Sequence, residues 1–339
     1  MSTAHRKPSF VLPAQLLAAG ILAAALALVG CGSGGAATAS SASPQVSAAP
    51  SASPTPRLAA DNWTTTIAFV KDDGIYTIDT DGTRLRRIVQ HAGWGGVAWS
   101  PNGQQIAYGT ANGLFVADAD GSERRQVTSG SLGPGPDLGS GLGAGVAWSP
   151  DGRQLVFGTP GGYVSKLEIV NVDGTGRREV PGLVDREYGI GYDANPAWSP
   201  SGRIFFSRFG FPRSGMGEIC SVNPDGSGLE LVTATEGFNS NVSNFFSLSP
   251  DGRWLLFWQE RSRRLVRLAA NGHGAPALVL DELPAGEGAV LSSWSPDGRW
   301  IVFGDIWSSR SLYMVRSDGS GLRKVPNTKG GSFPAWQTQ

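Results

Sequence analysis

Three segments of the chain concentrate side chains that could bind or react. Carboxylates in them could serve as a general acid or base. Arginines and aromatic residues grouped with carboxylates suit either a protein interface or a carbohydrate pocket. The alternative is that these segments are ordinary solvated loops. The candidate binding residues, from the segments 184–194, 208–217 and 235–244 and one isolated glutamate, are Asp185, Arg186, Glu187, Tyr188, Tyr192, Asp193, Arg208, Phe211, Arg213, Phe238, Asn239, Asn241 and Glu260.

Searches for known catalytic and metal-binding patterns favour binding over catalysis. No Gly-x-Ser-x-Gly elbow occurs, so a serine hydrolase of that class is not indicated. The only histidines are His5, His91 and His273, too few for a multi-histidine metal site. His91 falls in an expected connecting loop, where we interpret it as a solvated residue. We expect no catalytic residue, no metal and no cofactor.

Two Asp-x-Asp-Gly sequences resemble the start of a calcium-binding loop. They begin at Asp79 and Asp118. A loop of the EF-hand type also needs a glutamate at its twelfth position, where these segments have Gln90 and Ser129. The same turn recurs throughout the chain, so hairpin geometry explains it better, and calcium binding is a minor alternative.

The composition indicates an all-β domain without a nucleic-acid partner. The 339 residues include 48 Gly, 22 Pro and 11 Trp, with only 17% charged residues, which favours many turns and large apolar anchors. Lys plus Arg and Asp plus Glu both number 28, so no basic excess is available to neutralise a phosphate backbone.

A repeat of about 50 residues accounts for the turns and tryptophans. Five copies of the pattern Trp-Ser-Pro-Asp-Gly, with small variations, are spaced by 49, 50, 50 and 46 residues. Each copy precedes a short apolar strand whose third residue is aromatic. We expect the tryptophans to pack between neighbouring units. The copies begin at Trp99, Trp148, Trp198, Leu248 and Trp294.

Two incomplete copies at the ends of the repeat region complete each other. The aromatic strand 67–69 lacks a preceding tryptophan motif, and Trp336 lacks a following aromatic strand. If the segment around Trp336 forms the innermost strand of the unit begun at Ile67, six units close into a ring without an open sheet edge.

A second turn in each unit completes a four-stranded sheet. Asp-Gly or Asn-Gly recurs once per unit, between apolar runs, and predicts a hairpin with a primed turn. Each unit then has four antiparallel strands, and six such sheets around a channel make a six-bladed β-propeller over residues 61–339. These turns end at Gly82, Gly121, Gly174, Gly226, Gly272 and Gly319.

The repeat resembles the WD-like repeat of the TolB family. The resemblance rests on Ala-Trp-Ser-Pro-Asp-Gly-Arg, the aromatic strand after it, and the Asn-x-Asp-Gly-Ser/Thr-Gly turn, and it covers about 61–339. It implies a six-bladed propeller that works as a docking module in the bacterial envelope. TolB proteins carry a separate N-terminal domain where this chain has other segments, so a role in the Tol system does not carry over. The repeat is also similar to the propellers of prolyl-oligopeptidase-like enzymes.

The N-terminal segment is typical of a bacterial lipoprotein. A short cationic start precedes an apolar run of fourteen residues, 16–29, whereas a membrane-spanning helix needs roughly 20. Leu28-Val29-Gly30-Cys31 resembles a lipobox, which implies removal of the signal 1–30 and lipidation of Cys31. The alternative is an uncleaved anchor or a simple secretory signal. Residues 31–60, rich in Ala, Ser, Gly and Pro, are predicted to be a disordered tether.

These patterns together predict a lipid-anchored, extracytoplasmic binding or scaffold module of the cell envelope. We expect a monomer that binds an envelope protein or glycan, contacting the membrane through its lipid only. Recognition should use the ring face opposite the regular turns, where the variable segments emerge. A channel mouth lined by glycine, asparagine and aromatic residues would favour binding. Converging carboxylates such as Asp185, Glu187, Asp193 or Glu260 would favour the alternative, a lyase or hydrolase acting on sugars or lactones.

Overall fold

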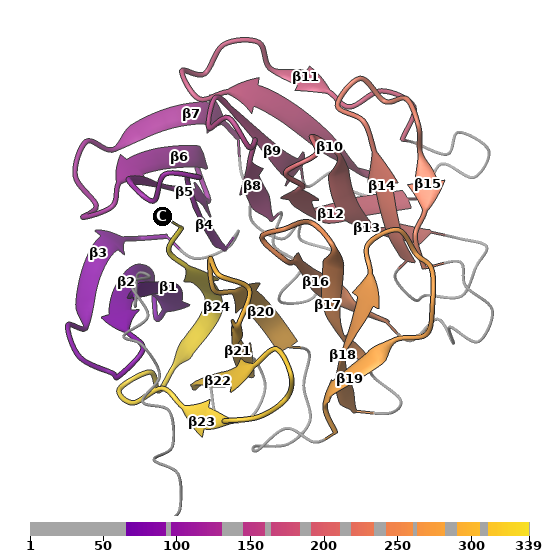
Figure 1. Cartoon of the computed structure of the whole chain (residues 1–339). Helices are drawn as coiled ribbons and strands as arrows, with labels where there is room; N and C mark the ends of the chain where they lie inside the picture. Colours follow the sequence, from indigo (N-terminus) through magenta and orange to yellow (C-terminus); the bar gives the residue numbers. More distant parts are fainter. Residues whose placement is uncertain are drawn as a thin grey trace, which may run out of the picture. The chain divides into compact units, whose positions relative to one another are not determined.

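In the computed structural model, the strands form the six blades of a β-propeller (Figure 1). The residues described are 66–92, 96–130, 145–159, 164–183, 191–210, 218–233, 242–259, 263–281, 290–305 and 311–338. The predicted signal, the tether and Cys31 lie outside these residues. In the part of the chain that is described, no helix is long and apolar enough to cross a bilayer.

Each blade has four antiparallel strands, ordered from the channel outward. Blade 1 consists of β24 (Gly331–Trp336), β1 (Thr66–Lys71), β2 (Gly74–Asp79) and β3 (Arg86–Gln90). Blade 2 consists of β4 (Val97–Trp99), β5 (Gln105–Thr110), β6 (Gly113–Asp118) and β7 (Arg125–Ser129). Blade 3 consists of β8 (Val146–Trp148), β9 (Gln154–Thr159), β10 (Val164–Asn171) and β11 (Arg178–Glu179).

The other three blades repeat the pattern. Blade 4 consists of β12 (Gly191–Trp198), β13 (Ile204–Gly210), β14 (Glu218–Val222) and β15 (Glu230–Leu231). Blade 5 consists of β16 (Val242–Leu248), β17 (Trp254–Gln259), β18 (Arg264–Ala269) and β19 (Ala277–Leu280). Blade 6 consists of β20 (Val290–Trp294), β21 (Trp300–Asp305), β22 (Leu312–Arg316) and β23 (Arg323–Lys324). A short parallel pairing of β10 with β12 also joins blades 3 and 4.

The predicted closure of the ring is confirmed. The C-terminal strand β24 pairs antiparallel with β1, placing Trp336 opposite Ile67 and Ala335 opposite Ala68. Beyond β24, the Gln337 side-chain amide donates to the Gly103 carbonyl at 2.9 Å, so the last residues also contact the first turn of blade 2. Two ends of the propeller region far apart in sequence therefore share one sheet, which removes two open strand edges.

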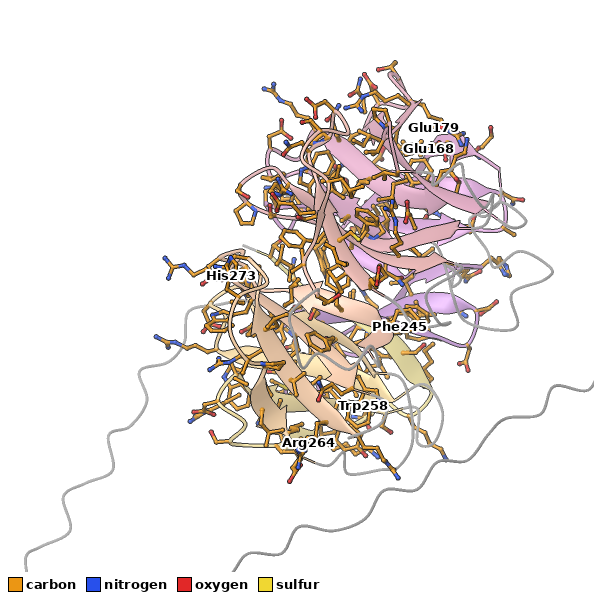
Figure 2. The ribbon with its side chains drawn as sticks, turned by 90° about the vertical axis from the view of Figure 1, so that its right-hand side faces the viewer. Glu168, Glu179, Phe245, Trp258, Arg264 and His273 are labelled. Carbon is orange, nitrogen blue, oxygen red and sulfur yellow. The ribbon has the colours of Figure 1, made fainter. Side chains whose placement is uncertain are left out.

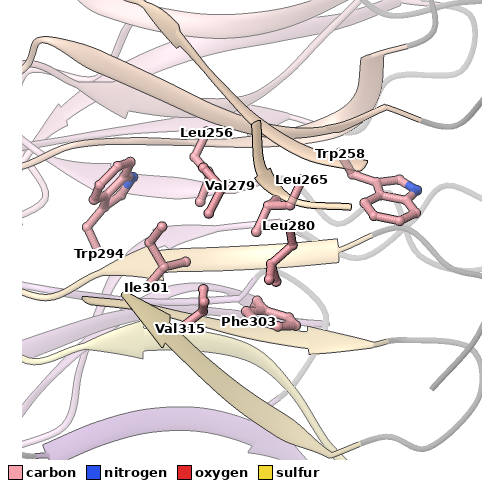
Figure 3. Close-up of a cluster of buried hydrophobic side chains, with 9 residues drawn as sticks. All are labelled: Leu256, Trp258, Leu265, Val279, Leu280, Trp294, Ile301, Phe303 and Val315. Atoms are coloured by element: carbon pink, nitrogen blue, oxygen red, sulfur yellow. The ribbon is translucent and has the colours of Figure 1, made fainter. Parts of the chain in front are cut away.

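The hydrophobic core is divided into six clusters, each between two consecutive blades. Figure 3 shows the cluster between blades 5 and 6, where Leu256 and Leu265 of one blade face Trp294 and Phe303 of the next. The predicted role of the tryptophans in packing between blades is thereby confirmed. Two of them also bond the preceding blade, because Trp99 Nε1 donates to the Ala335 carbonyl and Trp148 Nε1 to the Ala98 carbonyl, both at 3.1 Å.

The Asp-Gly hairpins differ from the primed turns that we expected. In these turns only the glycine has a positive φ, 87° at Gly121, whereas a primed type I turn needs positive φ at both central residues. Gly121 N donates to the Asp118 carbonyl at 2.8 Å, which describes a type I turn followed by a glycine in a bulge. The Asp120 carboxylate accepts a hydrogen bond from Ser122 N at 2.9 Å, so the turn aspartate stabilises the loop itself.

The glycine of each Asp-Gly turn also lets neighbouring blades approach closely. A Cβ at Gly121 would collide with the Ile88 carbonyl of blade 1. The equivalent glycine of every other blade likewise lies against the outermost segment of the blade before it. The residues facing the six glycines are, in blade order, Pro326, Ile88, Val127, Pro181, Val232 and Val279.

Candidate binding site at the channel mouth

The inner strands of all six blades contribute to one small cavity in the channel. It has a volume of about 150 Å³ and lies toward the starts of these strands, on the face opposite the regular turns. Figure 2 shows the turn that carries His273 at one edge of the molecule and Phe245 farther toward the opposite face. The first ring of lining residues, each three positions before the tryptophan or its equivalent, is Gly96, Gly145, Asn195, Phe245, Leu291 and Phe333.

Ten of the twelve residues that line the mouth of this channel have an apolar side chain or none, and polar backbone atoms share the exposed surface with them. The residues that follow the first ring also line the cavity, and Asn195 and Ser292 are the only polar side chains among the lining residues that the structure describes. No carboxylate or histidine lines the described cavity. A concave apolar site with a few polar groups is suited to holding a ligand. The second ring is Val97, Val146, Pro196, Phe246, Ser292 and Pro334.

The backbone is left-handed at two bulky residues of the first ring. Asn195 has φ of 52° and Phe333 has φ of 51°. Asparagine adopts this conformation at little cost, whereas a large aromatic residue does so rarely. Both residues lie where the inner strand shifts its register against the next strand. The bulge therefore aims a side chain of blades 1 and 4 into the channel at the cost of local strain.

Of the candidate residues predicted from sequence, the structure brings together Asp193 and Arg208. The guanidinium of Arg208 bonds both carboxylate oxygens of Asp193, at 2.8 and 2.9 Å, and donates to the Leu183 carbonyl at 2.6 Å. Burial alone would lower the pKa of Arg208, but the hydrogen bond and charge of Asp193 raise it above its usual range. The pair thus joins Leu183, at the end of blade 3, to blade 4, and both of its charged groups are largely buried.

The remaining predicted residues are not positioned by the structure. For Tyr192 the structure gives the backbone pairing only, in β12 opposite Phe209 of β13. The other candidates lie outside the described residues: Asp185, Arg186, Glu187, Tyr188, Phe211, Arg213, Phe238, Asn239, Asn241 and Glu260.

Cys220 lies behind the Asp193–Arg208 pair in the same blade. Its side chain belongs to the cluster between blades 3 and 4, and burial raises the pKa of its thiol to about 12. A thiol this weakly acidic stays protonated and unreactive at neutral pH. Cys220 is therefore a packed core residue.

The two Asp-x-Asp-Gly turns use their carboxylates within the turn. The Asp81 carboxylate accepts hydrogen bonds from Thr83 N at 2.9 Å and from the Thr83 hydroxyl at 2.6 Å, and Asp79 pairs with Arg84. The hydrogen bond from the Thr83 hydroxyl is the main cause of a lowered pKa at Asp81. Among the described residues, no three His, Cys, Asp or Glu side chains gather in a way that could hold a metal ion.

A second cavity of about 550 Å³ lies at the turn end of the channel. Its lining comes from blades 1, 2, 5 and 6 and includes repeated residues of the motif, among them Pro101, Pro250 and Pro296. The lining of this end therefore follows from the repeat, whereas that of the opposite mouth differs between blades.

The channel-mouth ring was missed by the sequence analysis, although its signal is present in the repeat. The residue three positions before each motif is Gly, Gly, Asn, Phe, Leu and Phe in blades 2, 3, 4, 5, 6 and 1. This position varies while the neighbouring tryptophan and turn recur. A residue that varies at a fixed place in a symmetric ring is free to serve recognition, and alignment of the six copies would have shown it.

Several solved structures share this fold. TolB from Acinetobacter baumannii aligns with a TM-score of 0.63 and 18% identity, over 81% of this chain and 67% of that one. A chain of a nidogen/laminin complex aligns with a TM-score of 0.59 and 13% identity, over 80% of this chain and 97% of that one. Hydrazine synthase from Kuenenia stuttgartiensis aligns with a TM-score of 0.50 and 13% identity, over 73% of this chain and 71% of that one. At these identities the likeness shows the fold alone.

The family follows from the sequence of the repeats. No curated protein matches the chain significantly. The family model of the TolB beta propeller domain matches residues 137–339, more than half of the chain and all of blades 3 to 6. The chain therefore belongs to the TolB beta propeller family.

Proposed function

We propose that this propeller is a non-catalytic binding or scaffold module that holds an envelope protein or glycan at its channel mouth. The observation that carries the proposal is the chemistry of the described part of the mouth, which is lined by glycine, asparagine and aromatic residues and by no carboxylate. The one predicted carboxylate that the structure describes near this end, Asp193, is paired with Arg208. A site of this kind can enclose an apolar group and orient it through Asn195.

The cellular setting is part of the proposal. The export signal, the lipobox at Cys31 and the tether 31–60 are predictions from sequence, and the TolB-like fold supports a place in the bacterial envelope. A tether of this length would hold the domain about 30 Å from its anchor. Metabolic labelling with a fatty-acid analogue tests the anchor: label on the wild-type chain but not on Cys31→Ser supports it, and equal labelling of both contradicts it.

The binding site is tested by comparing capture from cell-envelope extract. Phe333→Gly removes an aromatic side chain from the mouth at a backbone conformation that glycine adopts freely. We expect the species retained by the wild-type chain to be lost with Phe333→Gly and kept with Arg253→Ser, which alters an exposed side chain of a regular turn. Equal retention by all three chains would contradict a site at the mouth.

A further inference from the structure

Exposed cations that follow the Asp-Gly turn, on the outermost strands, are concentrated in four consecutive blades. The segment that follows the Asp-Gly turn holds at least two exposed cations in blades 6, 1, 2 and 3 and none in blades 4 and 5, whose equivalent segments, 227–231 and 273–278, are fully described. Figure 1 shows the outermost strands β23, β3, β7 and β11 following one another around one side of the ring. We call this arc the basic rim; its residues are Arg323, Lys324, Arg84, Arg86, Arg87, Arg124, Arg125, Arg177 and Arg178.

Some cations of the basic rim form ion pairs within the propeller, and others do not. Arg84 pairs with Asp79, and Arg177 pairs with Glu168. By contrast, the side chains of Arg86, Arg87 and Lys324 are exposed and make no hydrogen bond or ion pair with any described residue, although the charge of Arg86 acts on the Asp120 carboxylate in the same crevice. The chain as a whole has no net charge. A one-sided concentration of unpaired cations on such a chain is complementary to an anionic surface.

Exposed leucines accompany these cations. Leu85 stands between Arg84 and Arg86 with 41% of its surface exposed. Leu322 directly precedes Arg323 and is 38% exposed. Cations beside apolar side chains on a convex edge suit the interface of a bilayer, where headgroup phosphates meet acyl chains. Exposed leucines also lie in the equivalent segments of blades 4 and 5, at Leu229, Leu231 and Leu278. The leucines therefore add apolar contact, and the cations alone distinguish the basic rim from the other side of the ring.

The chain enters the propeller beside the basic rim. Thr66, the first described residue, lines the same crevice of about 540 Å³ as Arg84, Leu85 and Arg86. The predicted lipid attachment at Cys31 lies 35 residues before Thr66. If Cys31 is lipidated, the segment that leads to the membrane therefore starts at the basic rim.

We propose that the basic rim docks the propeller onto the anionic phospholipid headgroups of the membrane that anchors it, leaving blades 4 and 5 turned away. The inference uses the proposed anchor to bring the domain near a bilayer. The test measures docking of the basic rim and lipid anchoring with separate readouts, so that failure of the docking proposal can be distinguished from failure of the proposed anchor.

The test places a polarity-sensitive fluorophore at equivalent positions of the two halves. Leu85→Cys reports on the basic rim, and Leu229→Cys, three residues after the same turn glycine in blade 4 and 42% exposed, is the matched control. Cys220 is buried with a thiol pKa of about 12 and does not label. The wild-type full chain treated with the same dye gives the background from Cys31.

The full chain is reconstituted with neutral phosphatidylcholine vesicles and with vesicles containing about one third phosphatidylglycerol. We expect a blue shift at Leu85→Cys in the anionic vesicles only, abolished by about 0.5 M salt, and none at Leu229→Cys. Arg86→Glu with Arg87→Glu should lower the docking equilibrium constant about 100-fold. Arg253→Glu with Arg264→Glu, the same charge change in blade 5, should lower it less than about threefold.

Three results would overturn the proposal. They are equal shifts at both positions, a shift that persists in neutral vesicles, and a shift caused by soluble polyphosphate but not by anionic vesicles. Flotation of the chain with vesicles distinguishes anchoring by the lipid from docking by the basic rim. A chain that floats with both vesicle types without a shift at Leu85→Cys has an anchor and no docking rim, whereas one that floats only with anionic vesicles has the rim and no anchor.

Discussion

The two ends of the channel differ in how closely their residues repeat from blade to blade. At the turn end, Ser-Pro-Asp-Gly or a close variant recurs in five blades, and in each of them the serine carbonyl accepts a hydrogen bond from the turn glycine at 2.8 to 2.9 Å. At the opposite mouth the equivalent position holds glycine in blade 2, asparagine in blade 4 and phenylalanine in blade 1. The repeated residues build the ring, and the variable ones are available for recognition.

The seams between blades show the same distinction on a smaller scale. In blades 2 and 3 the motif tryptophan bonds the preceding inner strand. In blade 4 the indole of Trp198 instead donates to the Gly202 carbonyl of its own turn at 3.0 Å. In blade 6 the indole nitrogen of Trp294 is buried without a hydrogen-bond partner among the described residues. Packing tolerates these differences because apolar contact between blades, rather than one hydrogen bond, stabilises each seam.

The largest effect is expected where a turn glycine touches the preceding blade. Gly121 and Gly202 have nearly identical φ angles, 87° and 88°, but an added Cβ collides with the Ile88 carbonyl at Gly121 and meets nothing within 4 Å at Gly202. Gly121→Ala should therefore cost about 3 kcal/mol of unfolding free energy and Gly202→Ala about 1 kcal/mol. Urea denaturation measures both. Equal losses would mean that backbone strain alone makes glycine necessary.

A smaller difference in unfolding free energy is expected between two tryptophan variants. Trp148→Phe removes the indole N–H bonded to the Ala98 carbonyl and should cost about 1 kcal/mol beyond the lost apolar area. Trp294→Phe removes a buried N–H that has no partner in the described part of the chain, so the same change should cost about 1 kcal/mol less. Thermal unfolding of the two variants provides the measurement. A greater loss at Trp294 would contradict this assignment of hydrogen bonds.

Phe333→Gly should change stability little, although it deletes a half-buried aromatic side chain. Relief of the left-handed backbone at Phe333 offsets about 1 kcal/mol of the lost packing. Phe246→Gly, a neighbouring channel residue without positive φ, is the matched control and should destabilise clearly more in the same denaturation experiment. If both variants lose the same stability, Phe333 is not strained.

The smallest expected effect is on acid stability. A hydrogen bond from the Ser122 hydroxyl is the main cause that lowers the pKa of the exposed Asp120 carboxyl below its ordinary value of 3.8. A carboxyl whose pKa is lower in the folded than in the unfolded state stabilises the folded protein at pH values above its unfolded-state pKa. This stabilisation is lost as the pH falls through the folded-state pKa. Melting temperatures between pH 7 and pH 3 should fall slightly less for Asp120→Asn than for the wild type. An identical or steeper decline would contradict the role of this turn.

The sequence was sufficient for the architecture because the ring is encoded by residues that recur. Trp336 and Ile67 predicted the closing strand, and their pairing confirms it. The turn type was wrong because Asp-Gly is compatible with both a primed turn and a glycine bulge, and only the φ angle of the preceding residue separates them. The channel-mouth ring was missed because its members share a place in the repeat rather than a residue type. The burial of Asp193 against Arg208 depends on cross-strand register, which the loop composition does not encode.

The most direct test of a recognition site at the mouth is photocrosslinking from two positions in intact cells. A photoreactive amino acid replaces Phe246, which lines the mouth, or Arg253, an exposed residue of the repeated turn in the same blade. We predict one discrete crosslinked species from position 246, diminished by Phe333→Gly, and none from position 253. The same species from both positions, or from position 253 alone, would contradict the assignment of recognition to the variable end of the channel.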